Sequence, residues 1–83
     1  MLLKLYTTSY CHLCETALAL VLQQCNAEQI TLLEIAENQD LLNTYGMRIP
    51  VLQRADTLAE LNWPFNESDL QHFLSTQNKK ASI

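Results

Sequence analysis

Basic residues are scarce in this sequence. Five lysines and arginines stand against nine acidic residues in a chain of 83, and the net charge is −4. A nucleic-acid-binding domain carries a basic patch, so this composition argues against such a partner. The sequence also has no apolar run approaching the roughly 18 residues of a membrane span, and its first residues lack the features of a secretory signal. We therefore expect a cytoplasmic protein that binds neither nucleic acid nor membrane.

Cysteine is also sparse, with three residues in the chain. This odd count does not fit a disulfide scaffold, and in a cytosolic protein a cysteine pair is more often redox-active or metal-binding. The chain contains no internal repeat, no low-complexity segment and no linker. Its length fits one domain, which we predict over residues 1–77, followed by a flexible C-terminal tail at 78–83.

Two of the three cysteines are separated by two residues, in Cys11-His12-Leu13-Cys14. The pair follows an apolar, strand-like run at 2–6 and precedes a helical pattern. Cysteines at i and i+3 can close a small disulfide ring across the first turn of a helix. The first sulfur then lies near unpaired N–H groups and the positive end of the helix dipole, which lowers its pKa. We therefore interpret Cys11 as the attacking thiolate and Cys14 as its resolving partner.

Apolar spacing along the chain predicts the element order β-α-β-α-β-β-α. Because a helix connects the first two strands, they should be parallel with a right-handed crossover, whereas a short turn joins the last two strands as an antiparallel hairpin. We thus predict an α/β fold in which helices flank a four-stranded mixed sheet. The predicted strands cover residues 2–6, 29–35, 47–54 and 57–62, and the predicted helices cover 12–24, 37–45 and a segment after Asn66.

Three local features of these elements can also be predicted. Gly46, the only glycine, follows the second helix and should form a left-handed cap. Asn66 and Asp69 have the spacing of a capping box at the start of the last helix. In the fourth strand, Leu58 and Leu61 should point inward.

Three stretches carry a resemblance to a known family: the Cys-His-Leu-Cys motif at a strand-to-helix junction, Tyr-Gly-Met-Arg-Ile-Pro-Val at 45–51, and Trp-Pro-Phe-Asn at 63–66 before the last helix. Over nearly its whole length the chain resembles the glutaredoxin-like branch of the thioredoxin superfamily, especially its small, poorly characterised members. The resemblance implies a thioredoxin-like fold in which Pro50 follows a cis peptide bond and lies against the cysteines. It also implies that the backbone of Ile49 pairs with an extended substrate or with glutathione.

The chain departs from the better-known glutaredoxins at four places. Those proteins have Pro-Tyr between the cysteines, whereas residues 12–13 are His-Leu here. They usually have a lysine at the position of Thr8, and Thr-Val where 48–49 are Arg-Ile. Their glycine-rich acidic turn, which holds the amino-acid end of glutathione, is replaced by Asn-Trp-Pro-Phe at 62–65. We expect no tightly bound cofactor and retain glutathione as a candidate co-substrate.

Residues near the cysteine pair have more than one interpretation. His12 either tunes Cys11 electrostatically or is a solvated side chain in the first helical turn. Arg48 stabilises the thiolate, meets a substrate carboxylate, or is an ordinary surface arginine. Tyr10 either packs beside the site or has a purely structural role. The predicted substrate-binding residues are Tyr10, His12, Arg48, Ile49 and Pro50.

Together these features predict thiol–disulfide exchange with Cys11 and Cys14 as the catalytic residues. The partner would be a disulfide-containing or glutathionylated protein or a small thiol, and the protein would act as a monomer in electron transfer and cell redox homeostasis. Two alternatives stay open: a catalytically weak binding module with the same fold, and a dimer that carries a metal or an iron–sulfur cluster. We predict no metal site within one chain, because Cys25 lies too far along the helix to join the pair in a four-ligand zinc site.

Overall fold

The computed structural model describes residues 2–75, and the predicted tail at 78–83 lies outside that range. The described chain has the predicted order of elements. None of its helices is both long and apolar enough to cross a membrane, as far as residues 2–75 are concerned. The strands are β1 (Leu3–Thr7), β2 (Ile30–Glu34), β3 (Val51–Arg54) and β4 (Glu60–Asn62). The helices are α1 (His12–Leu22), α2 (Gln39–Tyr45) and α3 (Glu67–Ser75), with a short 3-10 turn at Ala27–Gln29.

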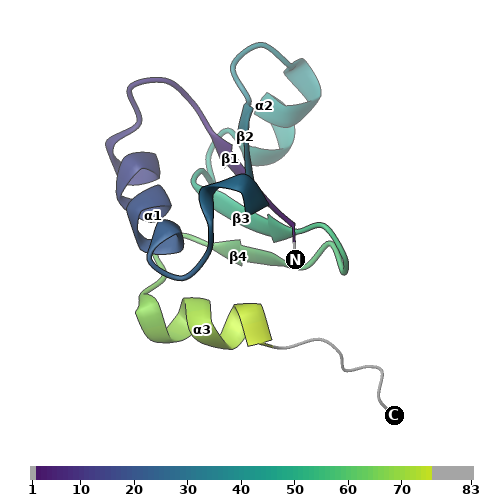
Figure 1. The fold of residues 1–83 in the computed structure, drawn as a ribbon. Helices are drawn as coiled ribbons and strands as arrows, with labels where there is room; N and C mark the ends of the chain where they lie inside the picture. The colour runs from purple at the N-terminus through teal and green to yellow at the C-terminus, as the bar shows by residue number, and fades with distance from the viewer. Residues whose placement is uncertain (1, 76–83) are drawn as a thin grey trace.

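The strands form one mixed sheet in the order β2-β1-β3-β4 (Figure 1). β1 and β2 are parallel, with Thr7 opposite Glu34 at the end of the pair. β3 runs antiparallel to both β1 and β4, and Tyr6 lies opposite Val51. The predicted α/β fold, with a parallel pair and a hairpin in one four-stranded sheet, is confirmed.

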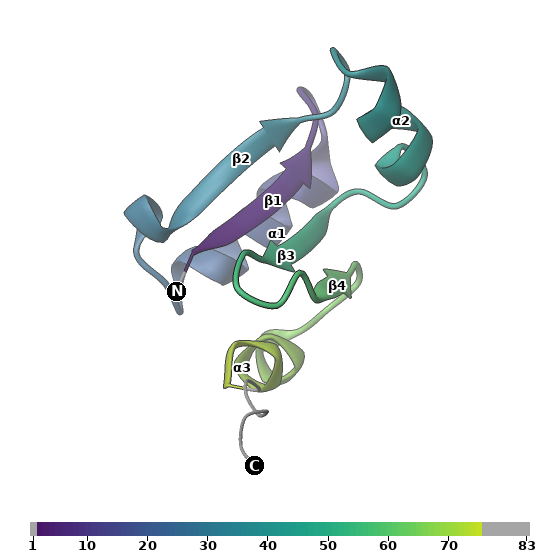
Figure 2. The same ribbon diagram turned by 90° about the vertical axis from the view of Figure 1, so that its right-hand side faces the viewer.

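Helices cover both faces of this sheet. Neighbouring residues of a strand point to opposite faces, so Leu5 and Tyr6 of β1 enter different core clusters. α1 and α3 pack on one face, while α2 packs on the other. Figure 2 looks onto the sheet and shows α1 behind the strands. The larger cluster contains Leu3, Leu5, Ala17, Val21, Leu52, Phe65, Leu70 and Phe73. The smaller cluster contains Tyr6, Ile35, Tyr45 and Val51.

The ends of α2 differ from the prediction. The helix begins at Gln39 because the side chain of Asn38 accepts a hydrogen bond from the Leu41 amide at 3.1 Å and caps it. Gly46 does not adopt the predicted left-handed conformation, since its φ is −52° and its amide donates to the Leu42 carbonyl at 2.8 Å. A Cβ at this position would lie 2.5 Å from that same carbonyl oxygen. Glycine is therefore required here by a close approach rather than by a positive φ.

The hairpin strands are shorter than predicted. The amides of Arg48 and Ile49 both donate to the Tyr45 carbonyl, at 2.8 and 3.0 Å, so these residues form a turn and β3 starts only after Pro50. The prediction that Leu58 points inward is wrong. Leu58 lies in the loop between β3 and β4, with a φ of 65° and a side chain that is 62% exposed.

Arg54 attaches the last helix to the sheet. Its side chain is 1% exposed although it is charged. It forms a two-point pair with Asp56, at 3.0 and 2.7 Å, and donates to the carbonyl of Phe73 at 2.9 Å. At its other end α3 has the predicted capping box, in which Asn66 and Asp69 exchange hydrogen bonds of 2.8 and 3.1 Å. Both ends of α3 are thus held by specific polar contacts.

Candidate active site

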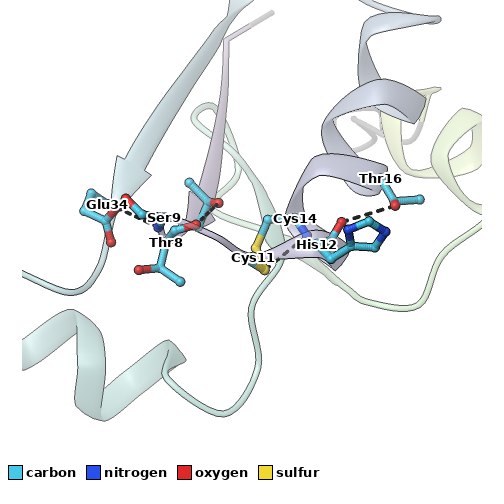
Figure 3. Close-up of a disulfide and its surroundings, with 8 residues drawn as sticks. Thr8, Ser9, Cys11, His12, Cys14, Thr16 and Glu34 are labelled. Atoms are coloured by element: carbon cyan, nitrogen blue, oxygen red, sulfur yellow. Dashed lines mark hydrogen bonds between the residues drawn. A yellow bond between two sulfur atoms is a disulfide. The ribbon is translucent and has the colours of Figure 1, made fainter.

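The cysteine pair forms a disulfide at the N-terminus of α1 (Figure 3). The two Cα atoms are 5.2 Å apart, a separation that a disulfide spans readily. Cys11 is the N-cap residue, and its Sγ accepts a hydrogen bond from the Cys14 amide at 3.1 Å. Cys14 is only 3% exposed, whereas Cys11 is half-buried. A reactant approaching from solvent therefore meets the sulfur of Cys11 first.

An acidic residue at the end of β2 holds the loop that precedes the disulfide. Glu34 accepts hydrogen bonds from the amide and hydroxyl of Ser9, at 3.1 and 3.3 Å, and from the Ala36 amide at 3.0 Å. Hydrogen bonding, first from the Thr8 side chain and then from the Ala36 amide, lowers the pKa of Glu34. Sequence reasoning missed this role. The available signal was an acid at the end of a strand parallel to the one that feeds the loop.

The peptide bond between Ile49 and Pro50 is cis, as the resemblance implied. Since Val51 pairs with Tyr6, Pro50 lies at the end of β1 from which the cysteine loop departs. Sequence reasoning did not foresee the second cis bond, between Trp63 and Pro64. The pairing of β1 with β3 thus brings the proline turn to the same end of the sheet as the loop that carries the disulfide.

A groove of about 400 Å³ opens beside the disulfide. It lies between the first turn of α1, the turn that precedes Pro50 and the end of β4. Its walls combine apolar side chains with one arginine and one amide. The lining residues are Leu13, Met47, Arg48, Ile49, Asn62 and Trp63. Two of the predicted substrate-binding residues, Arg48 and Ile49, are therefore in one cavity with a residue from between the cysteines.

Arg48 is held by the hairpin. Its Nη2 lies 2.5 Å from Glu60 Oε1 and 3.1 Å from Asn62 Oδ1. Its guanidinium lies 5.1 Å from the ring centroid of Tyr45, within reach of a cation–π interaction. Tyr45 in turn stacks on Tyr6 with ring centroids 3.9 Å apart, and its hydroxyl donates to Glu60 Oε2 at 2.7 Å. Arg48 is thus part of a connected group that reaches the smaller core cluster.

The other three predicted substrate-binding residues do not line the groove. Pro50 is fully buried. Tyr10 has a φ of 60° and a fully exposed side chain, so the expectation that it packs beside the site is wrong. His12 is also exposed, in the first turn of α1, and its carbonyl accepts a hydrogen bond from the Thr16 hydroxyl at 3.2 Å. Tyr10 and His12 flank Cys11 in sequence and remain available to a partner in solution.

The third cysteine is separate from the pair. Cys25 packs against the larger core cluster beyond the end of α1, and burial raises the pKa of its thiol. Among residues 2–75, no three histidine, cysteine, aspartate or glutamate side chains lie close enough together to hold a metal ion. Among the described cysteines, Cys11 and Cys14 thus form the disulfide, and Cys25 is a free thiol.

Comparison with known proteins gives one family and one structural relative. The family model described as glutaredoxin-like domain (DUF836) matches residues 2–75. The crystal structure of the Northeast Structural Genomics target protein XcR50 from X. campestris is 35% identical, with a TM-score of 0.78, over 87% of this chain and 93% of that chain. Its solution structure gives 35% identity and a TM-score of 0.77, over 89% and 92% of the two chains. No curated protein gives a significant match.

Proposed function

The chain belongs to the glutaredoxin-like domain family, and on this premise we propose that it is a thiol–disulfide oxidoreductase. Its four-stranded mixed sheet with flanking helices is a thioredoxin-like fold. The observation that carries the proposal is the unequal exposure of the two sulfurs. Cys11 is accessible at a helix N-terminus, and Cys14 is buried directly behind it. This arrangement suits an attacking sulfur and a resolving sulfur.

The proposed reaction begins when a reductant supplies two electrons and two protons to the disulfide. The Cys11 thiolate then forms a bond to one sulfur of a substrate disulfide, whose S–S bond breaks, and the departing sulfur takes up a proton. Cys14 attacks the Cys11 sulfur, restores the internal disulfide and releases the second substrate thiol. The substrate gains two electrons and two protons in all.

The protein contributes electrostatics and a surface for the substrate in this reaction. The Cys14 amide, which donates to Cys11 Sγ, and the dipole of α1 would stabilise the thiolate. The groove lined by Leu13, Arg48 and Ile49 would receive the residues around the substrate sulfur. We propose a disulfide-containing or glutathionylated protein as the substrate and glutathione as a co-substrate that is not tightly bound. We further propose that the protein acts as a monomer in the cytoplasm, in electron transfer and cell redox homeostasis.

The test is a titration of the reduced protein. The pKa of Cys11 should lie below the ordinary thiol value of about 8.5, and the dithiol should reduce a mixed disulfide between glutathione and a peptide. Titration against glutathione and against thioredoxin will identify the better reductant. A Cys11 pKa at the ordinary value, together with no exchange toward any disulfide, would overturn the proposal.

A variant without both sulfurs separates this proposal from the alternatives. Replacing Cys11 and Cys14 with serine removes exchange but leaves the groove intact. If the variant retains full biological activity, the protein is a binding module rather than an oxidoreductase. Colour and metal content after anaerobic purification test cluster carriage by a dimer.

A further inference from the structure

Opposite charges meet at the wall of the groove. Arg48 lines it and pairs with Glu60, which is not itself among the lining residues. Glu60 also accepts the Tyr45 hydroxyl, and Asn62 accepts from the same guanidinium nitrogen as Glu60. Nη2 of Arg48 thus donates two hydrogen bonds, and Tyr45 holds in place the Glu60 carboxylate that neutralises the arginine.

Other positive charge is scarce near the groove. Of the five lysines and arginines in the sequence, those at 79–80 lie outside the described residues. Lys4 lies near the start of β1, whereas the cysteine loop leaves the other end of that strand. Arg54 is engaged by Asp56 and by the end of α3. Within residues 2–75, Arg48 is therefore the lysine or arginine that lines the groove.

We propose that Glu60 determines which disulfides the site accepts. The inference rests on the proposed function. By neutralising Arg48, Glu60 leaves a groove whose other walls are apolar or uncharged, which favours neutral, apolar segments around the substrate disulfide. Glutathione carries two carboxylates, and it meets a cation that is already paired. Glu60 thus acts through Arg48 as a positioning and charge-balancing residue.

The chemistry of the pair supports this assignment. An arginine with free N–H groups binds a carboxylate strongly and often at two points. Here an entering carboxylate would have to displace Glu60 or lie close to its negative charge. Hydrogen bonds, first from Tyr45 and then from Arg48, lower the pKa of Glu60, so the group is charged at neutral pH. Because the two side chains are 37% and 26% exposed, the effect should be moderate and sensitive to salt.

The experiment compares two disulfides with reduced protein. Oxidised glutathione is the acidic probe and bis(2-hydroxyethyl) disulfide is the neutral one. The quantity compared is the second-order rate constant for oxidised glutathione divided by that for the neutral disulfide. This ratio cancels changes in the reactivity of Cys11. Glu60→Gln should raise this ratio by about fivefold, the scale of one partly exposed ion pair. The glutamine can still accept the Tyr45 hydrogen bond, and the gain should shrink as salt is added.

Two further variants complete a double-mutant cycle of Glu60 and Arg48. Arg48→Met leaves Glu60 unpaired, so the ratio should fall below that of the wild type. The double variant with both changes restores a neutral groove wall, and its ratio should return close to the wild-type value. Glu28→Gln is the charge-matched control, because it removes an acid in the turn before β2, at the opposite end of the sheet.

The outcomes separate the inference from the proposed function. An unchanged ratio in Glu60→Gln, or an equal gain in Glu28→Gln, would overturn the role of Glu60 while exchange itself continues. If Glu60→Gln does not fold, the Arg48→Met variant decides, since a ratio that does not fall contradicts the inference. A wild-type protein that reduces neither disulfide would instead overturn the proposed function.

Discussion

At the scale of single residues, the two bonded sulfurs are not equivalent. Cys14 is 3% exposed and belongs to the first turn of α1, whereas Cys11 stands at the cap and is reachable from solvent. The amide of Cys14 donates to the sulfur of Cys11, so the backbone that buries one sulfur also polarises the other. This asymmetry makes the order of attack a testable property.

Serine replacements should therefore have opposite effects. Cys14→Ser leaves the attacking sulfur but cannot resolve the intermediate, so a mixed disulfide with the substrate should accumulate. Cys11→Ser should form none, because the remaining sulfur is buried. Mass spectrometry of the protein after incubation with a mixed-disulfide peptide measures both. Cys25→Ser is the control and should behave as the wild type. Equal adducts on both variants would contradict the assigned order.

At the scale of elements, the loop before the disulfide depends on a strand that carries no cysteine. Glu34 joins the end of β2 to Ser9, 25 residues earlier in sequence (Figure 3). The pKa of Glu34 is lowered in the folded protein. Its stabilising contribution is therefore present above the unfolded pKa, about 4.3. That contribution is lost as the pH falls through the pKa that Glu34 has in the folded protein.

The acid sensitivity of the fold should reflect this contact. Between pH 5 and 3, stated as a range around the ordinary glutamate pKa of about 4.3, the wild type should lose stability more steeply than Glu34→Gln. Urea unfolding at a series of pH values measures the difference. Glu28→Gln, in the turn that leads into the other end of β2, is the matched control. Identical pH dependence in the wild type and Glu34→Gln would show that the contact is dispensable.

The attachment of α3 gives a second prediction at this scale. Arg54→Met keeps most of the side-chain volume but removes the donors to the Phe73 carbonyl. Removing one partner of a buried hydrogen bond costs about 1–3 kcal/mol, which urea unfolding will detect. Asp56→Asn should cost less, because Asp56 is an exposed partner of the arginine. A larger loss in Asp56→Asn would mean that the ion pair, rather than the helix contact, is the main role of Arg54.

At the scale of the whole molecule, local patterns predicted the architecture. Apolar spacing gave the order of strands and helices, and the spacing of Asn66 and Asp69 gave a capping box that is confirmed. The position of the cysteine pair before a helix also placed the Cys11 sulfur at the start of that helix, where the structure has it. These features depend on neighbours within a few residues, which a single sequence displays directly.

The partners of side chains far apart in sequence could not be predicted in the same way. Arg48 meets Glu60 twelve residues later, and Arg54 meets the carbonyl of Phe73 nineteen residues later. Such pairs depend on strand register and on where the hairpin loop ends, and the predicted hairpin was too long. The error at Leu58 had the same cause, since its positive φ belongs to a loop that was assigned to a strand. The candidate disulfide was therefore predictable, while the charge balance of its groove was not.

The way α3 is attached has a consequence for variation in this family. Arg54 binds main-chain oxygens at the end of the helix, and every residue type supplies such an oxygen. Substitutions in that final turn leave the acceptors in place, whereas each inserted or deleted residue shifts them by about 1.5 Å along the axis. Relatives that keep the buried arginine should accordingly differ in the amino-acid sequence of this helix but agree in its length.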